Sequence, residues 1–174
     1  MTGPKKSKQN ITIEDARIIF RNFEGKGDKY NVDGRRNFCV LLDDDIAGIL
    51  AKDGWNIRKL SAREEGDQDQ PYMQVSVSYK ARPPKIVLIS ETTKRRTYID
   101  EDTVHILDWA DIAMVDMIIS PYHWDVSGKQ GIKAYLKKMF VTLEEDELEL
   151  KYAEDGLSED DSYSDPDQDD EDPF

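Results

Sequence analysis

The 174-residue sequence predicts a small, mostly antiparallel β-domain followed by an acidic tail. Short apolar segments recur along residues 11–152, often with period-two alternation, and turn residues separate them, which is typical of strands joined by loops. Residues 153–174 carry eleven Asp or Glu and no Lys or Arg. Such a composition cannot bury enough apolar surface to offset its ordering entropy. We therefore expect a flexible basic arm over residues 1–10, a folded domain over 11–152 and a disordered tail over 153–174.

The first half of the domain is expected to hold three strands and a helix. Residues 11–23 alternate in part and predict a long first strand, and the apolar residues 38–42 predict the second. Between them, residues 24–36 form a turn-rich loop. Three consecutive aspartates open a predicted helix over residues 43–52, where acids provide an N-cap and favourable charge at the positive end of the helix dipole. We prefer this interpretation to a metal site. Residues 55–60 predict the third strand, and both Trp55 and Trp109 are expected in the core.

The second half contains the clearest strand signal in the chain. Apolar and polar residues alternate without a break over residues 72–80, with Met73, Val75 and Val77 on one face. The remaining elements are predicted at residues 86–89, 101–109 (a short helix), 112–119 and 132–143. Lys137 and Lys138 interrupt the alternation of the last strand, so we expect a β-bulge there. The prediction is about five to seven strands with one or two inserted helices.

Charge and composition limit the classes of function. Removing the eleven tail acids leaves 26 Asp and Glu against 24 Lys and Arg, so residues 1–152 are nearly neutral and can carry a local basic groove despite the formal charge of −13. No apolar run reaches the roughly 18 residues that a membrane helix requires, and we expect neither a signal peptide nor a membrane. A single cysteine, Cys39, allows no internal disulfide and fits a reducing cytoplasm.

Residue patterns for catalysis are weak. His105, His123 and the one cysteine are too far apart in sequence to form a recognisable metal cluster. Residues 128–131 lack the upstream glycine and the Ser/Thr of a phosphate-binding P-loop, and Gly25 with Gly27 is too little for a dinucleotide fingerprint. We therefore expect no enzymatic activity, no cofactor and no metal.

Aromatic and basic residues instead coincide, which is the pattern that single-stranded nucleic acid requires. Cations track phosphates, and flat rings receive unstacked bases at roughly 1–3 kcal/mol each. Lys133, Tyr135 and Lys137 share a face of the last predicted strand, and Tyr122 and Trp124 are expected in a loop. A plainer interpretation has Tyr135 half-exposed under lysine stems and Trp124 capping the core. The candidate binding residues are Lys29, Tyr30, Arg35, Arg36, Tyr72, Lys80, Arg82, Lys94, Arg95, Arg96, Tyr122, Trp124, Lys129, Lys133, Tyr135 and Lys137.

The ending Asp169-Asp170-Glu171-Asp172-Pro173-Phe174 resembles the C-terminal tip of single-stranded DNA-binding proteins (SSBs), where an acidic run closes on Pro-Phe and docks partner proteins. Asp172 departs from the bacterial pattern, which carries an aliphatic residue there, and the long Gly/Gln-rich bacterial linker is missing. The chain is more similar to the phage-encoded branch.

This resemblance implies an oligonucleotide-binding (OB) fold, and the number of predicted strands fits such a barrel. It also implies a protein that coats single-stranded DNA in replication, recombination or repair. The partner-binding residues would then be Asp169, Asp170, Glu171, Asp172, Pro173 and Phe174, and the partners a polymerase, primase, helicase or nuclease.

Two other functions stay open at this point: an acidic interaction protein whose tail imitates nucleic acid, and an RNA-binding OB domain. Periodicity alone does not separate a barrel from a sandwich, and it leaves a homo-oligomer open.

Overall fold

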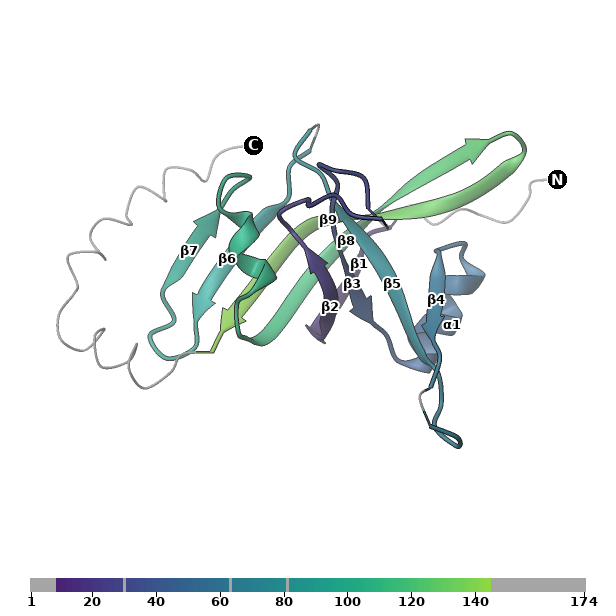
Figure 1. The fold of residues 1–174 in the computed structure, drawn as a ribbon, viewed down its shortest axis with the longest axis horizontal. Coiled ribbons are helices and arrows are strands. Elements are labelled where there is room, and N and C mark those ends of the chain that lie inside the picture. The colour runs from purple at the N-terminus through teal and green to yellow at the C-terminus, as the bar shows by residue number, and fades with distance from the viewer. Residues whose placement is uncertain (1–8, 30, 63, 81, 145–174) are drawn as a thin grey trace.

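The computed structural model describes residues 9–29, 31–62, 64–80 and 82–144 (Figure 1). Within these ranges it contains nine strands, one α-helix and one 3-10 helix, which is more strands than the sequence predicts. In chain order the elements are β1 (Ile11–Ala16), β2 (Ile18–Asn22), β3 (Arg36–Leu41), α1 (Asp44–Lys52), β4 (Ile57–Leu60), β5 (Gln70–Val77), β6 (Lys85–Ser90), β7 (Arg96–Ile99), the 3-10 helix η1 (Val104–Asp108), β8 (Ile112–Val126) and β9 (Lys129–Leu143).

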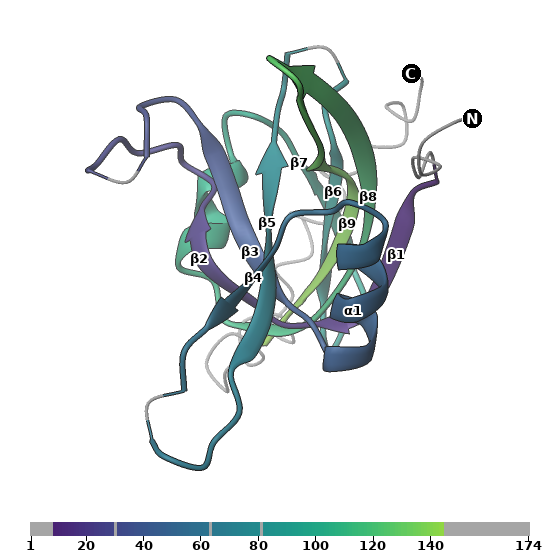
Figure 2. The same ribbon diagram turned by 90° about the vertical axis from the view of Figure 1, so that its right-hand side faces the viewer.

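All the strands belong to one mixed sheet that curves on itself. The main path runs β1-β8-β9-β5-β3-β2, and only Arg17 separates its two end strands in the chain. Strand β5 meets β9 in parallel through the pair Ser76 and Tyr135, whereas the other pairings on this path are antiparallel. This arrangement is mostly β and is consistent with an OB-like fold, a partly open barrel. Figure 1 shows α1 and β4 at one end of the molecule and β6 with β7 at the other, and Figure 2 shows it turned by 90°.

The core is built from the inward faces of the alternating strands. Met73, Val75 and Val77 of β5 are buried, as the alternation of residues 72–80 predicts, although the strand spans Gln70–Val77. Phe23 and Phe38 are fully buried and stack with their ring centroids 5.2 Å apart. Each such side chain contributes on the order of 1.5–3 kcal/mol when it is fully buried. This core holds the outward faces of the same strands in a fixed register.

The predicted bulge in the last strand is confirmed. Ile118 of β8 pairs with Lys138, and the next residue, Ile119, pairs with Leu136, so that Lys137 is the extra residue. Because of this extra residue, Tyr135 before the bulge points away from the core, and so do Lys138 and Phe140 after it. Leu136 and Met139 are buried in the core.

The predicted first strand, residues 11–23, is two strands instead of one. β1 pairs with β8 and β2 pairs with β3, and both pairings are irregular. Asp15 and Phe20 have positive φ values of 52° and 51°, in the left-handed region that non-glycine residues rarely adopt. The kinked segment therefore supplies both end strands of the path β1-β8-β9-β5-β3-β2.

The two predicted helices differ in outcome. α1 forms with Asp43 at the N-cap, but the Asp43 side chain makes no capping hydrogen bond, so Asp44 and Asp45 in the first turn supply only favourable charge. Residues 101–109 contain only the short 3-10 helix. Trp55 is buried as expected, whereas the expectation of a core position for Trp109 is wrong: 65% of its surface is exposed.

The predicted end of the strand at residue 119 is also wrong, because β8 continues through Pro121 to Val126. Beyond Ile119 no residue of β1 pairs with β8, so one edge of β8 is open there in the described chain. A proline costs no ladder hydrogen bond when its nitrogen faces an open edge. None of the helices in the described ranges is long and apolar enough to cross a membrane.

Candidate nucleic-acid interface

Strands β8 and β9 form a long hairpin that projects from the barrel (Figure 1). Its two-residue turn, Ser127-Gly128, has positive φ at both positions (53° and 82°), the geometry of a tight hairpin turn matched to strand twist. Tyr122 and Trp124 therefore lie in a strand and not in the predicted loop. The structure corrects the loop assignment and at the same time fixes which residues these rings face.

The cross-strand register brings four predicted residues onto one face of the hairpin. Tyr122 pairs with Lys133, Trp124 pairs with Gly131, and Ser120 pairs with Tyr135. Directly opposed residues in a sheet point to the same side. Tyr122, Trp124, Lys133 and Tyr135 consequently form one outward cluster.

This face continues across the barrel. Tyr135 pairs with Ser76 of β5, and along β5 the outward residues Gln74 and Tyr72 pair with Cys39 and Leu41 of β3. At the far side the exposed ring of Phe20 in β2 meets Tyr72 edge-on, with centroids 6.2 Å apart. We call this surface, which runs from the β8–β9 hairpin over β5 and β3 to Phe20, the outer groove face.

Trp124 lies against the backbone of the opposite strand. A Cβ atom added at Gly131 would come within 2.7 Å of Cζ2 and 2.9 Å of Cε2 of the indole, closer than real Cβ atoms approach. Only glycine at position 131 allows the ring to occupy this place. The half-buried indole is thereby positioned with its remaining surface toward solvent.

Tyr122 and Tyr135 form an edge-to-face pair, with ring centroids 6.1 Å apart at 88°. Tyr122 is 56% exposed, and Tyr135 is half-buried. The Nζ atom of Lys133 lies 5.2 Å from the Tyr135 ring centroid. The lysine-covered tyrosine of the plainer interpretation is thus present: the Tyr122 ring is open to solvent, whereas Lys133 covers part of the Tyr135 ring.

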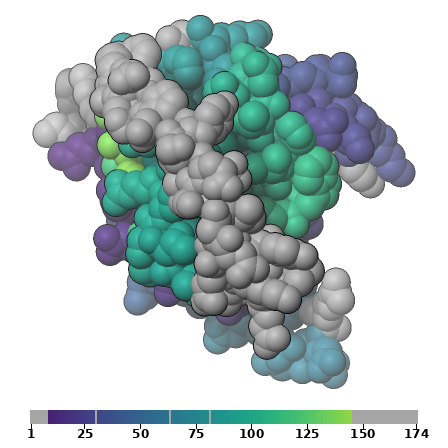
Figure 3. Space-filling model, turned by 90° about the vertical axis from the view of Figure 1, so that its left-hand side faces the viewer, coloured from purple at the N-terminus to yellow at the C-terminus, as the bar shows by residue number. Residues whose placement is uncertain are grey.

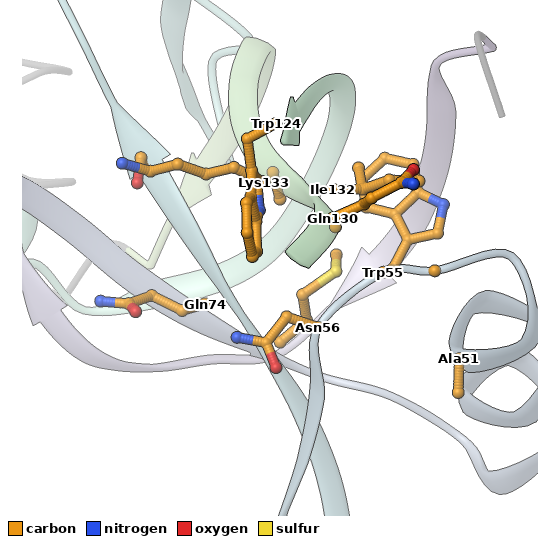
Figure 4. A pocket seen from close by; sticks show the side chains of 13 residues that line it. Ala51, Trp55, Asn56, Gln74, Trp124, Gln130, Ile132 and Lys133 are labelled. Atoms are coloured by element: carbon orange, nitrogen blue, oxygen red, sulfur yellow. The ribbon is translucent and has the colours of Figure 1, made fainter. Parts of the chain in front are cut away.

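A pocket of about 530 Å³ opens between the hairpin and the segment that precedes β4 (Figure 4). Trp124 and Lys133 line it from the hairpin, Gln74 from β5, and Asn56 from the chain before β4. The side-chain amides of Asn56 and Gln74 make no hydrogen bond within the part of the chain that the structure describes. Each amide offers a donor and an acceptor, which is what the edge of a base requires.

Arg58 and Cys39 complete this face. Arg58 pairs with Tyr72 and so lies on its side of the sheet. Burial raises the pKa of the Cys39 thiol to about 11, while the positive charge of Arg58 acts in the opposite direction. The thiol beneath this face is therefore neutral at physiological pH.

The loop between β2 and β3 holds Lys29 and Arg35, both exposed. Asn31 Nδ2 donates to the carbonyl oxygens of Lys26, Val32 and Arg35. These hydrogen bonds connect the two arms of the loop. Tyr30 lies outside the described residues.

Arg36 has a different environment. Its Nε donates to the Phe23 carbonyl, its Nη1 lies 3.2 Å from Glu101 Oε2, and its guanidinium sits 5.3 Å from the Tyr79 ring centroid. Burial raises the pKa of Tyr79 to about 12, and the charge of Arg36 opposes that shift. Arg36 of β3 thus connects three other segments of the chain through its contacts with Phe23, Tyr79 and Glu101.

The other predicted cations are distributed over the molecule. Lys80 follows the end of β5 and so does not share a strand face with Tyr72, and Arg82 lies in the next loop. Lys94 and Arg95 lie in the β6–β7 turn and Arg96 begins β7, at the end of the molecule opposite the hairpin (Figure 1). Lys129 is exposed at the hairpin tip and Lys137 at the bulge. The predicted partner-binding residues Asp169, Asp170, Glu171, Asp172, Pro173 and Phe174 lie outside the described residues.

Sequence reasoning missed several residues of this face: Phe20, Asn56, Arg58, Gln74 and Gly131. Arg58 was detectable, because the alternation over residues 55–60 places it with Asn56. Phe20 was not, since its positive φ turns it out of the core face that alternation predicts. Gly131 carries no signal until its cross-strand partner is known.

The cations of the outer groove face differ from Arg36 in having no carboxylate beside them among the described residues. Arg36 forms an ion pair with Glu101 at 3.2 Å, and neither Lys133 nor Arg58 forms one within 4.0 Å with a carboxylate of residues 9–29, 31–62, 64–80 and 82–144. Over the same ranges no three His, Cys, Asp or Glu side chains are grouped closely enough to hold a metal ion. Lys133 and Arg58 therefore face solvent on the outer groove face without a carboxylate partner there, which suits them to phosphate contacts.

Comparison with known proteins identifies one family and one set of structures. A family model described as "Putative phage ssDNA-binding domain" matches residues 1–174. No curated protein sequence matches the chain. The structure is similar to that of the single-stranded DNA-binding protein from bacteriophage Enc34 in complex with ssDNA, with a TM-score of 0.51 and 10% identity over 82% of this chain and 94% of that chain.

Two further structures of that phage protein are similar at 10% identity, and each match covers 82% of this chain. The C-terminally truncated form gives a TM-score of 0.49 over 94% of its own chain, and a further structure of the Enc34 protein gives 0.49 over 89% of its chain. At this level of identity the likeness to the Enc34 complex concerns the fold alone.

Proposed function

The chain belongs to the family of phage single-stranded-DNA-binding domains, and on this premise we propose that it coats ssDNA through the outer groove face with little sequence preference. The function proposed is binding, without a chemical reaction. The proposal concerns which residues hold the strand, how they hold it and what the acidic tail adds.

The observation that carries this proposal is the gathering of rings and cations on one face of the sheet. Tyr122 and Trp124 of β8 and Tyr135 of β9 lie beside Lys133, and Tyr72 of β5 extends the row. Base stacking on an aromatic side chain is worth roughly 1–3 kcal/mol per base and tolerates any sequence, because every base has a flat face.

The position of this face in the fold supports the same conclusion. In OB folds the face of the second and third barrel strands, with the loops that flank it, binds oligonucleotides. If the kinked β1–β2 segment is counted as the first strand of the barrel, β3 is the second strand and β5 is the third. Strands β8 and β9 are then the fourth and fifth, and their hairpin is the loop that connects them. This correspondence supports a role for the rings in holding a nucleic-acid strand.

Electrostatics should make the binding strongly salt-dependent. Lys133, Arg58 and Lys129 lie on or next to the face, and each phosphate they neutralise releases condensed counterions. The logarithm of the affinity is then expected to fall linearly with the logarithm of the salt concentration, by about 0.7 per phosphate contact for single strands.

We further propose that residues 153–174 recruit partner proteins of replication or recombination, such as a polymerase, primase, helicase or nuclease. Pro173 and Phe174 would enter an apolar pocket of the partner. The acids Asp169, Asp170, Glu171 and Asp172 would steer this ending toward a basic rim.

The test compares two tryptophan variants by fluorescence anisotropy with a labelled oligo-dT strand. Trp124→Ala should weaken binding by about five- to 100-fold, which corresponds to roughly 1–3 kcal/mol. Trp109→Ala, which removes the exposed tryptophan that follows η1, should bind like the parent. Equal effects of both variants would contradict the assignment of the outer groove face.

The same assay with double-stranded DNA and with RNA of matched sequence separates the other functions. Preference for RNA would indicate an RNA-binding domain. Absence of binding to any bare oligonucleotide in dilute buffer would instead favour an acidic protein that imitates nucleic acid.

A further inference from the structure

Strands β6 and β7 extend the sheet beyond the outer groove face. β6 runs parallel to β9 from the pair Lys85 and Lys138 to the pair Ser90 and Leu143, and β7 pairs with β6 in the antiparallel direction. Because of the bulge at Lys137, the outward residues of β9 in this part are Lys138, Phe140 and Thr142. Figure 3 views the molecule from the end where β6 and β7 lie, with their teal surface toward the viewer.

A second set of rings lies on this outward side. Phe140 of β9 pairs with Val87 of β6, and Val87 pairs with Tyr98 of β7, so the three side chains form one row across the sheet. Val87 is fully buried, although it does not belong to the core cluster of the described chain. Tyr98, at the edge of this row, keeps 39% of its surface exposed.

Two exposed cations lie over these rings. Lys85 Nζ is 5.0 Å from the Tyr98 ring centroid, and the Arg96 guanidinium carbon is 5.9 Å from the Phe140 ring centroid. Neither cation has a carboxylate within 4.0 Å among the described residues. Cations held at a ring in this way stay extended across the surface and available to a second, anionic partner.

The acidic groups near this surface are already engaged. Asp116 of β8 pairs with Phe140, and its Oδ1 accepts the backbone N–H of Asp15 at 2.8 Å. Asp100, which follows β7, accepts from the backbone N–H and the hydroxyl of Thr103. Both carboxylates thus accept hydrogen bonds within the chain, and neither forms an ion pair within 4.0 Å with Lys85 or Arg96.

This surface is continuous with the outer groove face through one strand. Tyr135, Lys138 and Phe140 all project outward from β9, which runs from the hairpin to β6 (Figure 1). Tyr135 and Phe140 are five residues apart, or roughly 16 Å at the usual rise of a strand. Lys137 and Lys138 lie between them, so cations occupy the interval between the two sets of rings.

We propose that the surface formed by Lys85, Arg96, Tyr98 and Phe140 is a second contact segment for the same DNA strand after it leaves the outer groove face. This inference rests on the proposed function and adds to it the path and length of the bound strand. Phosphates draw Lys85 and Arg96 away from the rings, and bases take their place on Tyr98 and Phe140. The occluded length then lies toward the upper end of the roughly 4–16 nucleotides that one OB fold covers.

The experiment measures affinity and salt dependence for a short and a long oligo-dT strand, about 6 and about 16 nucleotides, with the full chain. The first variant, Lys85→Gln with Arg96→Gln, removes the two charges. The second, Tyr98→Leu, keeps an apolar cover over Val87 but removes the flat ring. Lys52→Gln with Lys59→Gln, at the α1–β4 end, is the matched control, and thermal unfolding establishes that every variant folds.

For the long strand we expect the charge variant to reduce the slope of log affinity against log salt by about 1.4, because two phosphate contacts are lost. Tyr98→Leu should weaken long-strand binding at least about fivefold. On the short strand both variants should match the parent, whereas Trp124→Ala weakens binding at both lengths.

Parent-like binding of the long strand by both variants would overturn the second segment, and so would equal losses on the two lengths. Tighter binding by the charge variant would mean that an acidic polypeptide and not DNA occupies this surface, and would also overturn it. A Trp124→Ala variant with unchanged affinity would contradict the proposed function separately from this inference.

Discussion

Substituting Gly131 by Ala tests the position of the Trp124 ring without altering any aromatic or charged side chain of the outer groove face. The added Cβ would lie 2.7 Å from Cζ2, 2.9 Å from Cε2 and 3.0 Å from Nε1 of Trp124. All three atoms belong to a rigid indole, so the ring has to move as a unit. Gly131 has no left-handed backbone conformation that would penalise alanine. We therefore expect the fold to persist while the indole leaves its place.

The magnitude follows from the stacking contribution of the displaced ring. One base stacked on an aromatic side chain is worth roughly 1–3 kcal/mol, and each 1.4 kcal/mol is about a tenfold change in affinity. Gly131→Ala should therefore weaken binding to oligo-dT by about five- to 100-fold. Alanine in place of glycine restricts the unfolded chain, which favours folding, whereas the displaced indole loses packing, so the free energy of unfolding should change by no more than about 1 kcal/mol in either direction.

A double-mutant cycle with Trp124→Ala makes this test specific. Once the indole is absent, Gly131→Ala has nothing to displace, so the double variant should bind like Trp124→Ala alone, within about 0.5 kcal/mol. Gly48→Ala in α1 is the matched control, because its added Cβ meets no atom within 4 Å. Additive losses in the cycle, or a Gly131→Ala variant that binds like the parent while Trp124→Ala does not, would refute the proposed role of the ring position.

Three further predictions follow from charge and burial. Lys133→Gln should weaken binding to all sequences alike and reduce the salt slope of oligo-dT affinity by about 0.7, and an unchanged slope would remove Lys133 from the phosphate path. Deleting residues 165–174, which include six acids, should preserve or tighten ssDNA binding measured by anisotropy, and loss of binding would contradict the separate role of the tail. Because burial raises the pKa of Cys39 from 9.0 to about 11, its stabilising effect is complete below pH 9 and is lost as the pH rises toward 11. Relative to Cys39→Ala, the parent's free energy of unfolding in urea should fall over that interval, and parallel curves would contradict the burial of the thiol.

Local patterns predicted those elements whose cause is local. The unbroken alternation over residues 72–80 identified β5, the doubled lysine at 137–138 identified the bulge, and the acidic start at residue 43 identified α1. In each case the sequence signal comes from side-chain periodicity or from the first turn of a helix. Where the cause is a contact between distant segments, prediction was wrong. Trp109 follows a short 3-10 helix, Val104–Asp108, whose Val104 and Leu107 fill the core in its place.

The candidate site shows the same division. Lys133 and Tyr135 share a face because they are two residues apart in a strand, and this was predictable. Tyr122 and Trp124 lie on that face because of the register of β8 on β9. The sequence did not predict this register, because Pro121 indicated that the strand ended before these residues. Arg36 is one of the predicted cations, yet its side chain forms an ion pair with Glu101, 65 positions away in the sequence, within the folded domain. Register and long-range ion pairs depend on the assembled sheet, which no short segment encodes.

The central claim is that rings on the outer groove face hold the bases of a single strand. The most direct measurement is a titration of labelled oligo-dT in dilute buffer with the parent and with a Tyr122→Ala, Trp124→Ala, Tyr135→Ala triple variant whose folded state is verified by thermal unfolding. We predict saturable binding by the parent and a loss of at least about 100-fold in the triple variant. A parent protein that ignores the strand, or a folded triple variant that binds it as tightly as the parent, would contradict the claim.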